Sequence, residues 1–125
     1  MLKIKQLILS LILLLSTMSL SSVSMAKDIF TQQGKASWYG GKHHGKKTAS
    51  GVAYNMHSLT AAHKTLPFNS KVKVTDMNSG KCVIVRITDR GPYSGNRILD
   101  LSYAAAKDLD IINKGVAKVK LELLN

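Results

Sequence analysis

Apolar and polar residues alternate along three segments of the second half of the chain, residues 71–75, 83–87 and 117–123. In each segment every second residue is apolar, which is typical of a strand with one buried face. The turn-forming residues Asn78–Gly80 separate the first two segments, and a short connection of this composition favours a β-hairpin. Asn113–Gly115 gives a similar turn signal before the third segment.

The rest of the pattern predicts two more strands and one helix. Residues 34–39 and 97–101 have the composition of short strands, and Ser102 is a suitable N-cap for a helix over residues 103–109. Residues 27–33 form a lead-in without a clear pattern. Many short strands, one short helix and no repeating strand–helix unit indicate a mainly β protein, built as a small closed barrel rather than a parallel sheet.

The first 26 residues have the three regions of a secretory signal peptide. Lys3 and Lys5 precede the apolar run of residues 7–15, and Ser24–Ala26 places small residues at the cleavage positions. The apolar run is short for a membrane span, which needs roughly 20 residues. We therefore expect a signal peptide at residues 1–26 and an exported protein of the periplasm or cell envelope. An uncleaved membrane anchor is the alternative.

Residues 27–125 are enough for one domain and too few for two. They hold 16 of the 18 basic residues and all 7 acidic ones, so this part is strongly basic. A basic domain favours an anionic partner. Because an exported protein does not routinely meet nucleic acid, we expect anionic lipid headgroups or cell-wall carboxylates instead. The alternative is that the charge only keeps the domain soluble.

Cysteine and histidine add little chemistry to this picture. Cys82 is the single cysteine, so it has no partner for an intramolecular disulfide, and we expect a buried small apolar side chain. No cysteine follows the signal segment to carry a lipid, so we expect no lipid anchor. The four histidines match no metal-binding spacing. We therefore expect neither a metal site nor a cofactor.

Several motifs along the mature chain resemble those of the rare lipoprotein A (RlpA) family. The resemblance runs in unbroken order over residues 34–123. Its motifs are Ala36-Ser37-Trp38-Tyr39-Gly40, Thr48-Ala49-Ser50-Gly51, Leu59-Thr60-Ala61-Ala62-His63-Lys64-Thr65-Leu66-Pro67, Thr88-Asp89-Arg90-Gly91-Pro92-Tyr93 and Gly95-Asn96-Arg97-Ile98-Leu99-Asp100-Leu101-Ser102.

This resemblance implies a six-stranded double-psi β-barrel, a fold that the family shares with expansins. It also implies a lytic transglycosylase that cleaves peptidoglycan glycan strands, preferably strands without stem peptides, and leaves 1,6-anhydro-N-acetylmuramic ends. A role in cell-wall organisation and cell separation follows, with septal or other envelope proteins as partners. We expect the domain to act as a monomer.

The resemblance also assigns roles to individual residues. Asp89 matches the catalytic acid of the family and His63 matches the histidine that accompanies it. One motif departs from the family pattern, because Val52 stands where the family has a glutamate. We place the substrate-binding residues at Trp38, Tyr39, Tyr54, Thr60 and Arg97.

The scarcity of carboxylates is consistent with a lyase. Hydrolysis of a glycosidic bond ordinarily needs two carboxyl groups, and apart from turn, helix-end and outer-face positions only Asp89 and Asp100 remain. A lytic transglycosylase needs one, because the sugar's own C6 hydroxyl is the nucleophile. From the residues alone, each of these side chains also has a purely structural interpretation. Asp89 would then be an ordinary turn residue and His63 an ordinary half-buried histidine. Asp100 would pair with Arg97 or stabilise the start of the helix.

A second function class uses the same barrel. A non-catalytic, expansin-like domain would bind the cell wall through its aromatic residues and positive charge without cleaving it. Val52 favours this alternative, and the presence of Asp89 and His63 favours the enzyme.

Overall fold

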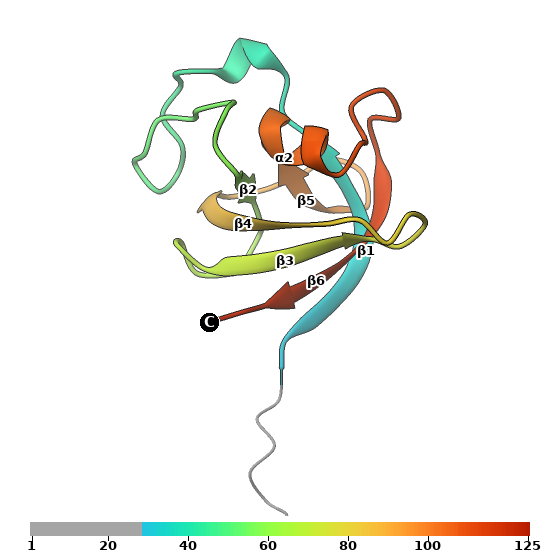
Figure 1. The fold of residues 1–125 in the computed structure, drawn as a ribbon. Helices are drawn as coiled ribbons and strands as arrows, with labels where there is room; N and C mark the ends of the chain where they lie inside the picture. The colour runs from blue at the N-terminus through green and yellow to red at the C-terminus, as the bar shows by residue number, and fades with distance from the viewer. Residues whose placement is uncertain (1–28) are drawn as a thin grey trace, which may run out of the picture.

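The computed structural model describes residues 29–125, which form a closed barrel with a short helix at one end (Figure 1). Alternating apolar residues form the strands because every second side chain can then enter the barrel interior. The strands are β1 (Thr31–Trp38), β2 (Thr60–Ala62), β3 (Lys71–Asp76), β4 (Cys82–Asp89), β5 (Arg97–Leu101) and β6 (Ala117–Leu123). The helical segments are η1 (Gly41–His43) and α2 (Tyr103–Asp108).

The strand order around the barrel is β1-β5-β2-β4-β3-β6, with β6 returning to β1. Two neighbouring pairs are parallel, β1 with β5 and β2 with β4, and the other pairs are antiparallel. Closure leaves none of these strands as an open edge. The expected fold class, a mainly β six-stranded barrel with one short helix, is confirmed.

The interior of the barrel is filled mainly by aliphatic side chains from all six strands and α2. Along β4, Val83, Val85 and Ile87 are buried while Ile84 and Arg86 are exposed. Fully buried leucine, isoleucine and valine side chains each stabilise the fold by about 1.5–3 kcal/mol relative to an exposed side chain. The barrel is therefore a packed core, and any ligand site must lie on its outside or at its ends.

Two local predictions are confirmed in detail. The hairpin joins β3 to β4 and is held by the carboxylate of Asp76, which accepts hydrogen bonds from the backbone N–H of Asn78 (2.8 Å) and Ser79 (3.4 Å). The hydroxyl of Ser102 caps α2 by accepting from the backbone N–H of Ala105 at 3.2 Å. The same hydroxyl donates to the carbonyl of Ser58 at 2.6 Å, which ties the helix to the loop before β2.

Three expectations need correction. Residues 31–33 of the lead-in belong to β1, because they pair with residues 120–122 of β6. The short strand β2 was not identified from the pattern, because three residues are too few to show alternation. Cys82 is exposed rather than buried, because it lies on the outer face of β4, two residues before exposed Ile84.

The signal peptide expected at residues 1–26 lies outside the described residues. Between residues 29 and 125, no helix has the length and apolar character required to cross a membrane.

Candidate active site

Asp89 is the last residue of β4, and its partly exposed carboxylate is held by three hydrogen bonds. The hydroxyl of Tyr39 donates to Oδ2 at 2.8 Å, and the backbone N–H groups of Ala49 and Arg90 each donate to Oδ1 at 2.9 Å. These donors come from the ends of β1 and β4 and from the loop between β1 and β2. The fold thereby fixes the orientation of this carboxyl group.

Tyr39 follows β1 directly, and its backbone N–H donates to the carbonyl of Leu101 at 2.8 Å. Its ring lies 5.1 Å from the ring of Tyr54 and 5.7 Å from that of His43, measured between centroids. Burial, followed by the hydrogen bond to Asp89, raises the pKa of the Tyr39 phenol well above its ordinary value. The phenol therefore stays protonated and remains a donor to Asp89.

Beside this carboxylate is a hollow of about 150 Å³ with an aromatic wall and basic residues around it. Its lining residues are Tyr39, His43, Lys46, Lys47, Thr48, Tyr54 and Asp89. The hollow, called here the Asp89 hollow, combines one acidic group with rings on which a sugar can stack and lysines that attract anions.

Asp100 is a second carboxyl group at this end of the barrel. It lies on β5 opposite Ser37 of β1, whose hydroxyl donates to it at 3.1 Å. Burial raises the pKa of Asp100, and Asp89 raises it further, while Ser37, Arg97 and His43 act to lower it. Within residues 29–125 Asp100 forms no ion pair with Arg97. Its direct hydrogen-bond partner is Ser37, so of the two roles expected from the sequence, an Arg97 pair or a partner of the helix start, the first is wrong.

His63 does not direct its ring toward the Asp89 carboxylate. The side chain is 3% exposed. Its Nδ1 accepts from the backbone N–H groups of Thr65 (3.1 Å) and Leu66 (3.0 Å), and its Nε2 lies 2.8 Å from Oε1 of Gln32. An acceptor at Nδ1 makes Nε2 the donor to Gln32 in the neutral ring. Burial lowers the pKa of His63, and the neighbouring cations Arg90 and Lys64 lower it further.

His63 still contributes to the position of Asp89 through the backbone. Its N–H donates to the carbonyl of Asp89 at 3.2 Å, where β2 leads into the following turn. Arg90 strengthens the same region, because its guanidinium donates to the carbonyls of His63 (3.2 Å) and Leu66 (2.8 Å). That guanidinium also lies 4.0 Å from the centroid of the Phe68 ring.

The residues expected to bind substrate fall in different places. Tyr39 and Tyr54 line the Asp89 hollow. The Trp38 ring packs against the core and lies 5.8 Å from the Tyr103 ring, and it lines neither hollow. Arg97 lines neither of the two hollows described here.

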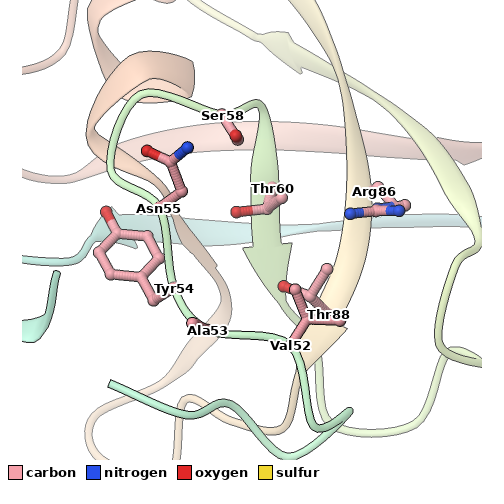
Figure 2. A pocket seen from close by; sticks show the side chains of 8 residues that line it. All are labelled: Val52, Ala53, Tyr54, Asn55, Ser58, Thr60, Arg86 and Thr88. Carbon is pink, nitrogen blue, oxygen red and sulfur yellow. The ribbon is translucent and has the colours of Figure 1, made fainter. Parts of the chain in front are cut away.

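Thr60 lines a second hollow, of about 270 Å³, on the outside of the barrel (Figure 2). The loop from Val52 to Ser58 forms one side and strands β2 and β4 form the other. Its lining residues are Val52, Ala53, Tyr54, Asn55, Ser58, Thr60, Arg86 and Thr88. Tyr54 lines both hollows. We call this the Arg86 hollow, because its one ionisable group other than the Tyr54 phenol is the guanidinium of Arg86.

The substrate-binding residues expected from the sequence did not include the hollow-lining residues His43, Lys46, Lys47, Thr48 and Arg86. Nothing in the local pattern around the two lysines or Arg86 distinguishes them from other exposed cations of a loop or strand. Between residues 29 and 125 no group of three or more histidine, cysteine, aspartate or glutamate side chains could hold a metal ion.

Comparison with known proteins places this geometry in a family. A family profile described as "Lytic transglycolase" matches residues 31–121. The chain is 59% identical over 93 residues to the endolytic peptidoglycan transglycosylase RlpA of Neisseria meningitidis serogroup B, and 54% identical over 95 residues to that of Vibrio cholerae. These alignments cover 74% and 76% of this chain but 39% and 36% of the relatives, so the chain matches well under half of their length.

Solved structures share the fold at lower sequence identity. The Streptomyces papain inhibitor superposes with a TM-score of 0.60 at 22% identity, covering 77% of this chain and 96% of the inhibitor. The expansin of Clavibacter michiganensis superposes with a TM-score of 0.61 at 20% identity, covering 77% of this chain and 51% of the expansin. At these identities the similarity concerns the fold alone. The family profile and the close RlpA relatives together show that this chain belongs to the lytic transglycolase family.

Proposed function

We propose that this protein is a lytic transglycosylase that cleaves the glycan strands of bacterial peptidoglycan and leaves 1,6-anhydro-N-acetylmuramic ends. The observation that carries the proposal is the Asp89 carboxylate, fixed by three hydrogen bonds beside a hollow with aromatic walls. The names of the RlpA relatives support the same reaction.

In this mechanism one carboxyl group serves twice. Protonated Asp89 donates its proton to the glycosidic oxygen as the bond from that oxygen to C1 of the muramic residue breaks. The C6 hydroxyl of the same residue then forms a bond to C1, and the Asp89 carboxylate takes up the hydroxyl proton. The proton count is restored and no water is consumed. A single acid–base group is therefore sufficient, which suits a domain with few carboxylates.

The neighbouring residues support this chemistry by position. The Tyr39 phenol, kept protonated by burial, holds one oxygen of Asp89 in place. The partly buried ring of Tyr39, which packs on the buried Tyr54 ring, offers apolar surface to a sugar. Lys46 and Lys47 attract an anionic polymer. His63 acts as a positioning residue rather than a proton carrier, because both ring nitrogens already have partners within the protein.

The cellular setting belongs to the same proposal. A substrate in the cell wall places the protein outside the cytoplasmic membrane, in the periplasm or envelope, in agreement with the signal peptide expected at residues 1–26. We further propose that it prefers strands without stem peptides, contributes to cell-wall organisation and separation together with septal or envelope proteins, and acts as a monomer without a lipid anchor.

A non-catalytic wall-binding function remains the second candidate. The observation that favours it is Val52, which is 48% exposed at the Arg86 hollow and offers no carboxylate where the resemblance to the RlpA family implies a glutamate. In this case the protein would bind glycan through the same surfaces without cleaving it.

The two candidates differ in their products. Peptide-free glycan strands incubated with the purified protein should yield fragments with 1,6-anhydro ends, detected by mass spectrometry, and Asp89→Asn should yield almost none. If the strands bind the wild-type protein but stay intact, the wall-binding function is supported and the enzymatic function is contradicted.

A further inference from the structure

The Arg86 hollow lies on the outer face of the barrel, where strand alternation places Arg86. Val85 and Ile87 on either side of it are buried in the core, so Arg86 faces outward. Thr60, its partner in the parallel pairing of β2 with β4, faces the same space. Figure 2 shows Thr60 between Arg86 and the loop from Val52 to Ser58, with the side chains of these elements around one cavity.

The polar groups of this hollow are mostly hydrogen-bond donors. Arg86 contributes its guanidinium, and Ser58, Thr60 and Thr88 contribute hydroxyls. The Asn55 Oδ1 already accepts from the backbone N–H of His57 at 2.9 Å, so the amide nitrogen of Asn55 is its free polar end. No acidic residue lines the hollow, and Val52 and Ala53 are apolar.

The charge of Arg86 is not neutralised by the described part of the chain. Among residues 29–125 the one ion pair joins Lys81 to Asp110 at 3.4 Å, and neither residue lines this hollow. No hydrogen bond from the Arg86 guanidinium to another residue of this part of the chain occurs either; only its backbone N–H donates, to the carbonyl of Leu59 at 3.1 Å. The planar fork of an arginine matches the two oxygens of a carboxylate.

The hollow is also next to the candidate reaction centre. Thr88 lines it and Asp89 lines the other hollow, so consecutive residues of β4 serve the two cavities, and Tyr54 lines both. Because the two hollows adjoin at Thr88 and Asp89, a glycan with its scissile bond at Asp89 brings the substituents of a neighbouring sugar toward Arg86. In peptidoglycan, the muramic residue carries a lactyl group that ends in a carboxylate when no peptide is attached.

We propose that the Arg86 hollow binds the free lactyl carboxylate of a muramic residue, with Thr60 and Thr88 as additional donors. The proposal rests on peptidoglycan glycan as the substrate and names the group that the protein recognises in it. A stem peptide converts this carboxylate into an amide, which removes the charge and adds bulk. In this chain, where Val52 leaves the guanidinium without an acidic neighbour in the hollow, Arg86 would therefore favour the free acid over the amide.

The test compares two ligands that differ in this one group. Peptide-free strands are bound to the purified protein either directly or after carbodiimide coupling of their lactyl carboxylates to methylamine. We expect the wild-type protein to bind the free acid about tenfold more tightly, equivalent to about 1.4 kcal/mol. In Arg86→Gln the ratio should fall well below tenfold, whereas Lys118→Gln, which removes one exposed positive charge from β6, should keep the wild-type ratio.

A second variant tests the hollow without removing the arginine. Val52→Glu introduces a carboxylate among the lining residues, where it should pair with Arg86 and lower the preference for the free acid to the same extent as Arg86→Gln. Because Val52 and Arg86 are both exposed, we expect both variants to fold, and thermal unfolding checks this.

The possible outcomes separate this inference from the proposed reaction. If folded Arg86→Gln still binds the free acid tenfold more tightly than the amide, the inference is contradicted. It is also contradicted if peptide-bearing strands bind as tightly as peptide-free strands and this binding depends on Arg86, because the ligand would then be a peptide carboxylate. If the ratio depends on Arg86 but the wild-type protein forms no 1,6-anhydro ends, the binding site stands and the reaction is wrong. Anhydro ends formed without any preference in binding would support the reaction and refute the site.

Discussion

The Asp89 and Arg86 hollows lie side by side but differ in chemical character. The first holds a carboxylate whose oxygens are fixed by a phenol and two backbone N–H groups. The second holds a guanidinium with hydroxyls around it and no acid. One is suited to moving a proton and the other to recognising an anion. A single strand end can thus supply catalysis and recognition, provided that its side chains alternate between two cavities.

The alternation at the end of β4 explains how this arises. Arg86 and Thr88 share one face of the strand, and Ile87 and Asp89 share the other. The parallel pairing with β2 changes register here, since Ala61 pairs with Ile87 whereas Ala62 pairs with Asp89. This irregularity at Thr88 ends the regular strand and brings Asp89 to the end of the barrel, next to Tyr39.

The largest effect in this comparison should come from Asp89→Asn. The amide keeps the shape of the side chain but cannot donate and recover a proton in the same way, so turnover should fall by about 10²–10⁴-fold. Binding to peptide-free strands should remain close to wild type, because the Arg86 hollow is unchanged. Release of anhydro products by wild type and variant at equal rates would show that Asp89 is not the acid–base group.

Tyr39→Phe should have the next largest effect on turnover. It removes the phenol that donates to Asp89 Oδ2 and leaves the ring that packs against Tyr54. A hydrogen bond to a charged group contributes about 1.5–3 kcal/mol, so turnover should fall by roughly 10–100-fold. Steady-state kinetics should show this loss in kcat with little change in KM. A change confined to KM would mean that Tyr39 only binds the sugar.

Asp100→Asn tests whether one carboxyl group is enough. The variant keeps the size of the side chain, and its amide oxygen can still accept from Ser37. We expect turnover to change by about tenfold or less, equivalent to about 1.4 kcal/mol, because Asp100 is hydrogen-bonded to Ser37 and not to Asp89. A loss as deep as that of Asp89→Asn would give Asp100 an essential role and refute the single-carboxyl mechanism.

His63→Gln should affect stability more than turnover, because His63 belongs to neither hollow. Loss of its buried hydrogen bonds should reduce the free energy of unfolding by about 1–3 kcal/mol at pH 7.5. The lowered pKa of folded His63 means that the unfolded chain binds the proton more readily. Its contribution to stability is therefore present above about pH 6.5 and is lost as the pH falls toward the folded pKa.

The measurement is thermal unfolding of wild type and His63→Gln between pH 7.5 and 5. The wild-type melting temperature should fall more steeply with decreasing pH than that of the variant. If the melting temperatures of wild type and variant fall in parallel with pH, and the folded variant loses its turnover, His63 has a catalytic role instead.

Much of the fold was predictable because its signals are local. Alternation identified β3, β4 and β6, and turn residues identified the hairpin at Gly80. The N-cap Ser102 could be identified because a serine before a run of alanines needs no distant partner to cap a helix. Asp89 was selected from the sequence because its motif resembles the family's and because few other carboxylates remain.

What the sequence determined by itself is therefore the family, the barrel and the candidate acid. The tertiary structure decided which way the side chains face and which residues lie next to them. Gln32 of β1 hydrogen-bonds to the His63 ring, Ser37 hydrogen-bonds to Asp100, and Arg86 lines one cavity with the 52–58 loop. These residues are from 28 to 63 positions apart in the sequence. Local propensity carries no information about such pairs, because barrel closure and strand register set them, and a shift by one residue would turn each side chain to the opposite face.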